Sequence, residues 1–311
     1  MATKRERGFG CAQHDGMQLL FSPFLGQGHY CSGCLTFTLM LRICRLLLSL
    51  GSILLSSATP AASITERNFQ PHFDRYGVRG SILLYEEATG RYVAYNLQRC
   101  RQGFLPASTF KIPNTLIGLQ TGALPDTATI CKWDGVKRDF RQWNQDMSYA
   151  QALRVSCVPC YQQLARQVGV KQYQQWLPKL AYGRMDVKPQ NVDTFWLDGN
   201  SRITQFEQVE FLRRLHAEKL PVALRHQRAV KRILELKKTP EYTLYGKTGW
   251  RFRSATNADN GWFVGWLDRV DGRTFYFALN IEPPTGQPAN DQFISARRAV
   301  TEAVLQELKW L

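Results

Sequence analysis

The segment Pro106-Ala107-Ser108-Thr109-Phe110-Lys111 places a serine and a lysine three residues apart. On a helix such a pair projects from one face, with Cβ atoms about 5–6 Å apart. A serine hydroxyl is a weak nucleophile unless a base takes its proton, and a lysine can be that base only when burial keeps its amine neutral. The pattern therefore predicts a nucleophile, Ser108, activated by Lys111. An ordinary helix start with a solvated lysine would have the same sequence.

Two further triplets carry groups that such chemistry needs. Ser156-Cys157-Val158 lies inside a stretch with helical periodicity, residues 147–168, and offers a second hydroxyl to pass a proton to a leaving nitrogen. Lys247-Thr248-Gly249 lies at the end of an expected strand and offers a cation, a hydroxyl and a glycine beside which a ligand can approach the backbone closely. Each triplet is a weak signal alone. Together with the Ser108–Lys111 pair they predict an acyl-transfer site.

Several other kinds of site are missing from the sequence. The chain has no G-x-S-x-G, H-E-x-x-H, G-x-x-x-x-G-K-[ST] or G-x-G-x-x-G motif. Its five histidines are scattered, and no C-x-x-C pair is followed by the partner residues that a zinc site requires. These absences argue against a Ser-His-Asp hydrolase, and no metal site is predicted.

The hydrophobic pattern predicts the elements that position these residues. Two runs rich in Ile, Leu, Val and Tyr, residues 81–85 and 91–97, indicate a β-hairpin, and a helix should begin near Ser108. Residues 124–238 have apolar side chains at three- and four-residue spacing, which indicates helices. One of these helices should begin at Thr204 with a capping box. Further strands are expected at residues 242–247, 262–267 and 274–281, before a last helix at 291–308.

Strands at both ends of the chain with helices between them predict an α+β fold. We expect an antiparallel β-sheet flanked by N- and C-terminal helices and built from residues 63–123 and 239–311. An all-helical domain, at about residues 124–238, should be inserted between the two parts of the sheet.

The first 62 residues resemble targeting sequence rather than a domain. Residues 40–62 contain a basic start, the apolar run Leu46–Ser57 and a small-residue zone, which is typical of a secretory signal peptide. Residues 1–39 are interpreted as an over-extended start. The expected mature domain is therefore residues 63–311, periplasmic or secreted, with no membrane contact after cleavage. The alternative for the apolar run is a short buried helix.

Composition limits the remaining function classes. The chain has 311 residues, 44% hydrophobic and 21% charged, with a formal net charge of +15, which excludes disorder as its main state. The basic stretch 213–238 is not interleaved with aromatics or glycine, so we predict a solvated helix face and no nucleic-acid partner. Cys157 and Cys160 are expected to be small buried core residues rather than a redox or metal pair. No disulfide pairing is predicted among them, Cys100 and Cys131.

The order of Ser-x-x-Lys, Ser-x-Val and Lys-Thr-Gly resembles that of the penicillin-recognising serine enzymes, and specifically of class D β-lactamases (oxacillinases). The resemblance covers essentially the whole expected mature chain. It includes Pro106–Asn114, Lys132-Trp133-Asp134-Gly135, residues 193–199 and the last helix. It implies a β-lactamase/transpeptidase-like fold and hydrolysis of the β-lactam amide of penicillin-type antibiotics through an acyl-enzyme.

The resemblance also implies a role for each matching residue. Ser108 matches the acylated serine, and Lys111 matches a lysine that CO2 or bicarbonate converts to an N6-carboxylate, the general base of both acylation and deacylation. Val158 and Leu197 match the apolar residues that enclose this group, and the indole N–H of Trp196 matches the donor that holds it. No separate cofactor is implied.

The remaining matches concern the substrate. Ser156 resembles the proton-shuttling serine, and the backbone N–H groups of Ser108 and Trp250 resemble an oxyanion hole. Arg297 resembles the arginine that binds the substrate carboxylate, although its neighbour Arg298 could be mistaken for it. The other positions implied to act on or bind substrate are Lys247, Thr248, Gly249 and Tyr182.

One position departs from the family pattern. This chain has Tyr182-Gly183-Arg184 where the family usually has Tyr-Gly-Asn, which puts loop packing and substrate preference in doubt.

Three alternatives stay open at this point. A β-lactam sensor domain would be acylated without turnover, and a transpeptidase-like penicillin-binding protein would use an uncarboxylated lysine. The third is a secreted domain with a degenerate site. The expected oligomeric state is a monomer or a homodimer.

Overall fold

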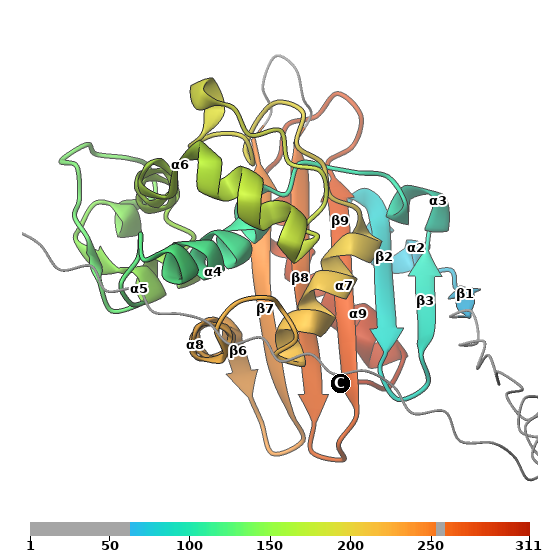
Figure 1. Cartoon of the computed structure of the whole chain (residues 1–311). Helices are drawn as coiled ribbons and strands as arrows, with labels where there is room; N and C mark the ends of the chain where they lie inside the picture. Colours follow the sequence, from blue (N-terminus) through green and yellow to red (C-terminus); the bar gives the residue numbers. More distant parts are fainter. Residues whose placement is uncertain (1–62, 253–258) are drawn as a thin grey trace, which may run out of the picture. The chain divides into compact units, whose positions relative to one another are not determined.

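The computed structural model describes residues 63–252 and 259–311 (Figure 1). The predicted over-extended start and signal peptide fall on residues 1–62 and therefore lie outside the described residues. Across these two ranges, no helix is both long enough and apolar enough to span a membrane.

A mixed β-sheet forms the centre of the described domain. Seven strands in these ranges pair in the order β1-β3-β2-β9-β8-β7-β6. Strand β1 is parallel to β3, and the other neighbours are antiparallel, so the predicted antiparallel sheet has one parallel edge strand. The strands are β1 (Ile64–Glu66), β2 (Arg79–Glu86), β3 (Arg91–Tyr95), β6 (Glu235–Lys238), β7 (Tyr242–Arg251), β8 (Asn260–Arg269) and β9 (Thr274–Glu282). A two-stranded sheet pairs β4 (Ile130–Cys131) with β5 (Met147–Ser148).

Helices cover both faces of the large sheet, as the α+β prediction requires. Helix α7 packs on one face against β2, β8 and β9, whereas α9 packs on the other face (Figure 1). The helices are α2 (Gln70–Asp74), α3 (Leu97–Cys100), α4 (Lys111–Thr121), α5 (Tyr149–Arg154), α6 (Val158–Leu180), α7 (Gln205–His216), α8 (Leu224–Leu234) and α9 (Asp291–Glu307). Short 3-10 helices are η1 (Ala107–Phe110), η2 (Arg141–Trp143) and η3 (Pro189–Asn191).

The helical part of the fold does not coincide with residues 124–238. Helix α4 contacts α6 and α8, so the helix that follows Ser108 belongs with the helical part. Helix α7 instead covers the sheet. The predicted capping box is confirmed, because Thr204 caps α7 and Glu207 reaches back to the Thr204 backbone.

Two hydrophobic clusters follow from this layering. One contains Phe110, Tyr161 and Trp196 and lies between the sheet and the helices α4 to α8. The other contains Phe277 and Val300 and lies between the sheet and α9. The segment that carries Ser108 therefore begins inside the first cluster, where packing can hold it rigidly.

The expected helix at residues 147–168 is two helices with a turn between them. Helix α5 ends at Arg154 and α6 begins at Val158. Ser156, between them, has a φ of +60°, in the left-handed region that non-glycine residues seldom adopt. Pro159 lies in the first turn of α6, where its missing N–H leaves no hydrogen bond unmade.

Candidate active site

Ser108 and Lys111 lie in contact where η1 becomes α4. Lys111 Nζ donates a hydrogen bond to Ser108 Oγ at 2.8 Å. In a neutral amine the same separation allows the nitrogen lone pair to accept the hydroxyl proton. A backbone hydrogen bond also fixes the segment that carries Ser108: the N–H of Ala107 donates to the Trp196 carbonyl at 2.9 Å. The predicted nucleophile–base pair is therefore present in the folded chain.

The environment of Lys111 favours its neutral form. The side chain is completely buried, and its Nζ lies 5.3 Å from the centre of the Tyr161 ring. Burial lowers the pKa of Lys111 from 10.5 to about 7. Among the ion pairs of the described residues, none joins Lys111 to a carboxylate. A substantial fraction of this amine is thus deprotonated at neutral pH.

Ser156 and Lys247 form a second pair across the same site. Lys247 Nζ donates to Ser156 Oγ at 2.9 Å and to the Thr248 carbonyl at 2.9 Å. Burial lowers the pKa of Lys247 well below its usual value, and the charges of Lys111 and Arg297 act in the same direction. Ser156 makes this contact from a backbone conformation with positive φ. The hydroxyl can therefore exchange protons with a lysine that holds its proton weakly.

Arg297, not Arg298, contributes to the site from the last helix. Its Nη1 donates to the Gly249 carbonyl at 3.0 Å, and only 9% of its surface is exposed. Burial lowers its pKa to about 10, so it remains a cation at neutral pH. Arg298 is exposed, with its guanidinium over the Phe263 ring. The cation that faces the cleft is thus Arg297.

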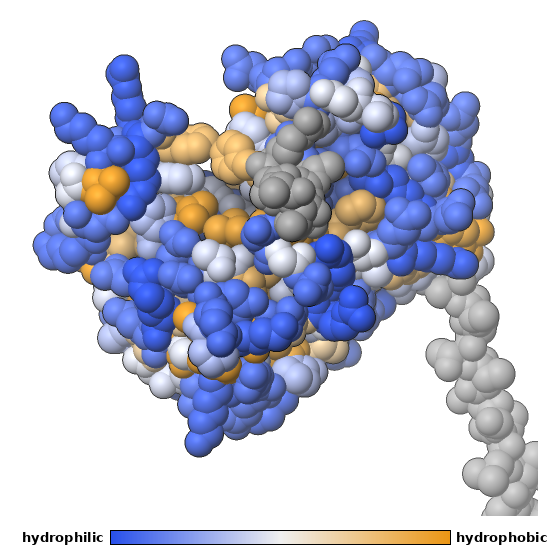
Figure 2. All heavy atoms as spheres, turned by 90° about the horizontal axis from the view of Figure 1, so that it is seen from above, coloured by the Kyte–Doolittle hydropathy of each residue, from blue (hydrophilic) through white to orange (hydrophobic). Residues whose placement is uncertain are grey.

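Two neighbouring cavities lie against these residues. A cavity of about 120 Å³ has walls from Ser108, Ser156, Thr248, Trp250 and Arg297, which brings together the groups that the sequence spread across the chain. Hydrophobic side chains gather in a hollow on the face seen from above in Figure 2.

A second, mainly apolar cavity of about 330 Å³ includes Val158, Leu197 and Trp250 in its walls. The predicted apolar residues Val158 and Leu197 therefore line the same cavity in this structure.

Trp196 has a buried N–H without an acceptor. The side chain is fully buried and stacks on Phe110 with ring centres 5.2 Å apart, and its Nε1 has no hydrogen-bond partner in the structure. Leaving such a donor unpaired costs roughly 1–3 kcal/mol. A carboxylated Lys111 would present oxygen acceptors to this part of the core. The indole donor, the dry amine and the absence of a competing carboxylate on Lys111 fit that group.

The Lys-Thr-Gly triplet lies within β7 rather than at its end. Strand β6 pairs with β7 only as far as Tyr245. Beyond that residue β7 has no strand partner on this edge, and η1 packs against β7. A Cβ at Gly249 would lie 3.2 Å from the Pro106 carbonyl and 3.3 Å from Thr109 Cγ2. The glycine thus permits close packing of β7 on the nucleophile segment. The oxyanion role of the Ser108 and Trp250 N–H groups stays a prediction.

Tyr182 packs behind the segment that carries Ser108. The side chain is fully buried, its hydroxyl is 3.1 Å from Thr109 Oγ1, and it lines neither of the two cavities. Its predicted contact with substrate stays a prediction. Arg184 is exposed and forms backbone hydrogen bonds with Arg202, so the departure from Tyr-Gly-Asn leaves this loop ordered by its backbone.

The sequence reasoning missed several residues of the cleft. Phe140, Gln142 and Trp143 come from the loop around η2 and line the cavity beside Ser108. Phe252, at the end of β7, lines both cavities and is half exposed. The available signal was the pair Phe140 and Trp143 in an otherwise polar stretch, where burial in the hydrophobic core would not be expected.

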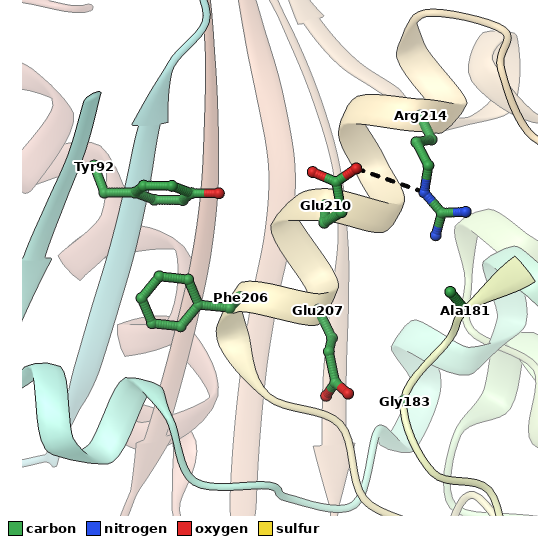
Figure 3. Close-up of a pocket in the computed structure, with 7 residues that line it drawn as sticks. All are labelled: Tyr92, Ala181, Gly183, Phe206, Glu207, Glu210 and Arg214. Carbon is green, nitrogen blue, oxygen red and sulfur yellow. Dashed lines mark ion pairs between the residues drawn. The ribbon is translucent and has the colours of Figure 1, made fainter. Parts of the chain in front are cut away.

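A third cavity, of about 600 Å³, lies between β3 and α7 (Figure 3). Tyr92 and Phe206 form one wall with ring centres 5.3 Å apart. Glu210 pairs with Arg214 at 3.7 Å, and Glu207 is engaged in the cap of α7. Because its acidic groups are occupied within the protein, we assign no chemistry to this cavity.

Comparisons with known proteins agree with this geometry. A family model described as penicillin binding protein transpeptidase domain matches residues 67–306. Beta-lactamase OXA-48 of Klebsiella pneumoniae is 39% identical over 243 residues, covering 78% of this chain and 88% of the relative. Beta-lactamase OXA-10 of Pseudomonas aeruginosa is 37% identical over 230 residues, covering 73% and 86%.

Solved structures give the same result. The class D beta-lactamase YbXI from Nostoc is 39% identical with a TM-score of 0.72, covering 78% of this chain and 98% of that one. A class D beta-lactamase from Sebaldella termitidis is 31% identical with a TM-score of 0.75, covering 80% and 99%.

Proposed function

Because this chain belongs to the class D β-lactamases, serine hydrolases that open the amide bond of penicillin-type antibiotics, we propose that Ser108 is the residue acylated by the β-lactam. The observation that carries the proposal is the 2.8 Å contact between Ser108 Oγ and the buried Lys111 amine, whose pKa is lowered to about 7. A hydroxyl with a neutral base in contact can attack the strained amide carbonyl without a histidine.

We propose further that CO2 carboxylates Lys111. The neutral amine forms a bond to the carbon of CO2 and releases one proton. Once formed, the carboxylate supplies an anionic oxygen base for acylation and for deacylation. The buried amine, the unpartnered Trp196 N–H and the apolar neighbours Val158 and Leu197 support this assignment. Class D β-lactamases need no separate cofactor.

The other residues of the cleft have separate tasks in this proposal. Arg297 and Thr248 bind the substrate carboxylate, since a buried guanidinium and a hydroxyl suit an anion. Ser156, held by Lys247, delivers a proton to the leaving nitrogen. The backbone N–H groups of Ser108 and Trp250 stabilise the oxyanion of the tetrahedral intermediate.

A turnover assay with mass measurement tests the proposal. The full chain is incubated with a chromogenic cephalosporin, with and without added bicarbonate, and the protein mass is followed. We expect many turnovers per chain, stimulated by bicarbonate, and complete loss of acylation in Ser108→Ala. One stable adduct per chain without turnover would instead identify a sensor. Turnover independent of bicarbonate would contradict the carboxylated lysine.

We also propose that the protein works in the periplasm or outside the cell, on the basis of the signal-like residues 40–62. Fractionation of cells that express the full chain tests this, because a cytoplasmic protein of unprocessed mass would contradict it. Whether the enzyme is a monomer or a homodimer stays a prediction that gel filtration with light scattering can settle.

A further inference from the structure

The turn that carries Ser156 also carries two cysteines whose sulfur atoms are in contact. Cys157 Sγ and Cys160 Sγ lie 2.7 Å apart, closer than unbonded sulfur atoms normally approach and near the disulfide bond length of about 2.05 Å. Both side chains are buried, as the sequence predicted, and both are free thiols here. Burial alone does not explain why the two sulfur atoms should face each other.

The helix start makes the two thiols chemically different. Cys157 is the N-cap of α6, and its sulfur accepts the backbone N–H of Cys160 at 3.4 Å. This is the setting in which the first thiol of a Cys-x-x-Cys pair becomes a thiolate. The hydrogen bond from the Cys160 thiol lowers the pKa of Cys157, whereas contacts with Cys131 and Cys157 raise that of Cys160. Cys157 is therefore the attacking sulfur and Cys160 the resolving one.

A small opening leads to the pair. Cys131, Cys157 and Cys160 line a cavity of about 60 Å³, which also includes Lys132, a side chain 75% exposed. This space is large enough for water, which needs roughly 10–15 Å³ on the same measure. Hydrogen peroxide, which is little larger than water, fits such a space. Within the described ranges, no group of three or more His, Cys, Asp or Glu side chains is arranged to hold a metal ion.

We propose that Cys157 and Cys160 are a peroxide-oxidised dithiol that closes to a disulfide and clamps the turn carrying Ser156. The Cys157 thiolate attacks one peroxide oxygen, the O–O bond breaks, and the released hydroxide takes a proton to become water. The sulfenic acid left on Cys157 is then attacked by the Cys160 sulfur. This step forms the S–S bond and releases a second water with the thiol proton. Two thiols and one hydrogen peroxide thus give one disulfide and two waters.

The position of the pair gives the disulfide a consequence. Cys157 follows Ser156, whose left-handed φ of +60° is strained for a residue other than glycine and needs support from its surroundings. Val158, between the two cysteines, lines both cavities of the site. Closing the bond shortens the distance between the two sulfur atoms only from 2.7 Å to about 2.05 Å. Because this movement is small, we expect Ser156 to keep its contact with Lys247. Oxidation therefore stabilises the active turn instead of disrupting it.

Peptide mass spectrometry tests the chemistry without any reference to lactamase activity. The full chain, reduced and then exposed to hydrogen peroxide, is alkylated under denaturing conditions and digested. We expect the peptide with Cys157 and Cys160 to have lost two hydrogen atoms and to resist alkylation, while Cys100 and Cys131 are alkylated. Alkylation of all four cysteines, or a bridge to Cys131, would overturn the proposal.

Thermal unfolding tests the clamp. The melting temperature of the oxidised chain should exceed that of the reduced chain by roughly 2–6 °C. In Cys160→Val, dimedone should trap a sulfenic acid on Cys157 and the redox-dependent shift should vanish. The matched variant Cys131→Val should keep both the disulfide and the shift. A shift that persists in Cys160→Val would contradict the clamp.

A measurement of activity adds a second test, the only one that rests on the proposed function. Oxidised enzyme should retain the kcat of reduced enzyme. A loss of kcat would mean that the disulfide bond distorts the turn, against the proposal.

Discussion

Burying the Lys111 amine lowers the stability of the fold when the amine is protonated, and the same burial makes the amine a base. Its folded-state pKa of about 7 lies below the value of 10.5 for a free lysine, because burial penalises the charged form. Between these two pH values the unfolded chain binds more protons than the folded chain at this position. The contribution of Lys111 to the free energy of unfolding therefore rises with pH across this window and is flat below it.

Substitution of the lysine should remove this dependence. We expect the free energy of unfolding of the unmodified chain to gain up to about 1.4 kcal/mol per pH unit from Lys111 between pH 7 and 10, relative to Lys111→Met. Urea unfolding of both proteins in bicarbonate-free buffer measures the difference. Lys132→Met, which removes an exposed lysine and keeps Lys111, serves as the control and should retain the pH dependence of the unmodified chain. Equal pH dependence in all three proteins would mean that Lys111 is not buried in its neutral form.

Trp196 offers a second test at the scale of one residue. Trp196→Phe keeps an aromatic ring but removes the unpartnered N–H, which the proposal pairs with the carboxylated lysine. A hydrogen bond to a charged group contributes about 1.5–3 kcal/mol, so the bicarbonate concentration for half-maximal activity should rise at least about tenfold. Bicarbonate titration of turnover measures this. Trp266→Phe, another buried tryptophan with an unpartnered N–H, controls for packing and should leave the titration unchanged.

At the scale of elements, catalysis depends on the fit between β7 and η1. A methyl group at Gly249 would meet the Pro106 carbonyl and Thr109 at 3.2 and 3.3 Å, so the strand must move a few tenths of an ångström from the nucleophile segment. Small misplacements of catalytic groups are costly, and Gly249→Ala should lower kcat/KM by about tenfold or more.

The matched substitution for this prediction is Gly118→Ala in α4. Its added methyl would also be close, at 3.1 Å from the end of the flexible Leu164 side chain and 3.3 Å from Leu124 Cβ, but it would meet no backbone of the nucleophile segment. Steady-state kinetics should therefore show near-normal activity for Gly118→Ala. Equal activity in both variants would show that the β7–η1 fit is not limiting.

Much of the element pattern was predictable from the sequence, and the exceptions have physical reasons. Short apolar runs located β8 and β9, and the capping box at Thr204 located α7, because burial and hydrogen bonding act locally there. The break at Ser156 was missed because helical periodicity continues through it, although Pro159 was a signal for a new helix start. The burial of Tyr182 was not predictable, because a motif match gives a neighbourhood but not the direction of a side chain.

At the scale of the whole molecule, residues far apart in the chain assemble one cleft. Ser108 comes from the first part of the fold, β7 from the last strands, and Arg297 from the final helix on the opposite face of the sheet. Arg297 reaches the site by passing beside Gly249, to whose carbonyl it donates a hydrogen bond. The resemblance pointed to Arg297, and only the tertiary structure separates it from its neighbour Arg298, which is exposed.

Arg297→Ala should weaken substrate binding more than it slows chemistry. Loss of a charge-assisted contact with the substrate carboxylate should raise KM for penicillins by about 10- to 100-fold. The penicillin methyl ester, which lacks the carboxylate, should be hydrolysed about equally by the variant and the unmodified enzyme. Arg298→Ala, whose side chain faces outward, should behave normally with both substrates. An equal loss with acid and ester would assign Arg297 a purely structural role.

The central claim is that the amine in contact with Ser108 is neutral at the working pH. Nitrogen-15 NMR of the lysine side chains in CO2-free buffer, with Lys111→Met to assign the signal, measures this directly. The account predicts a titration midpoint for Lys111 near 7, far from the ordinary lysine value of 10.5. A Lys111 signal that stays protonated up to pH 10 would contradict it, since such an amine could neither accept the serine proton nor combine with CO2.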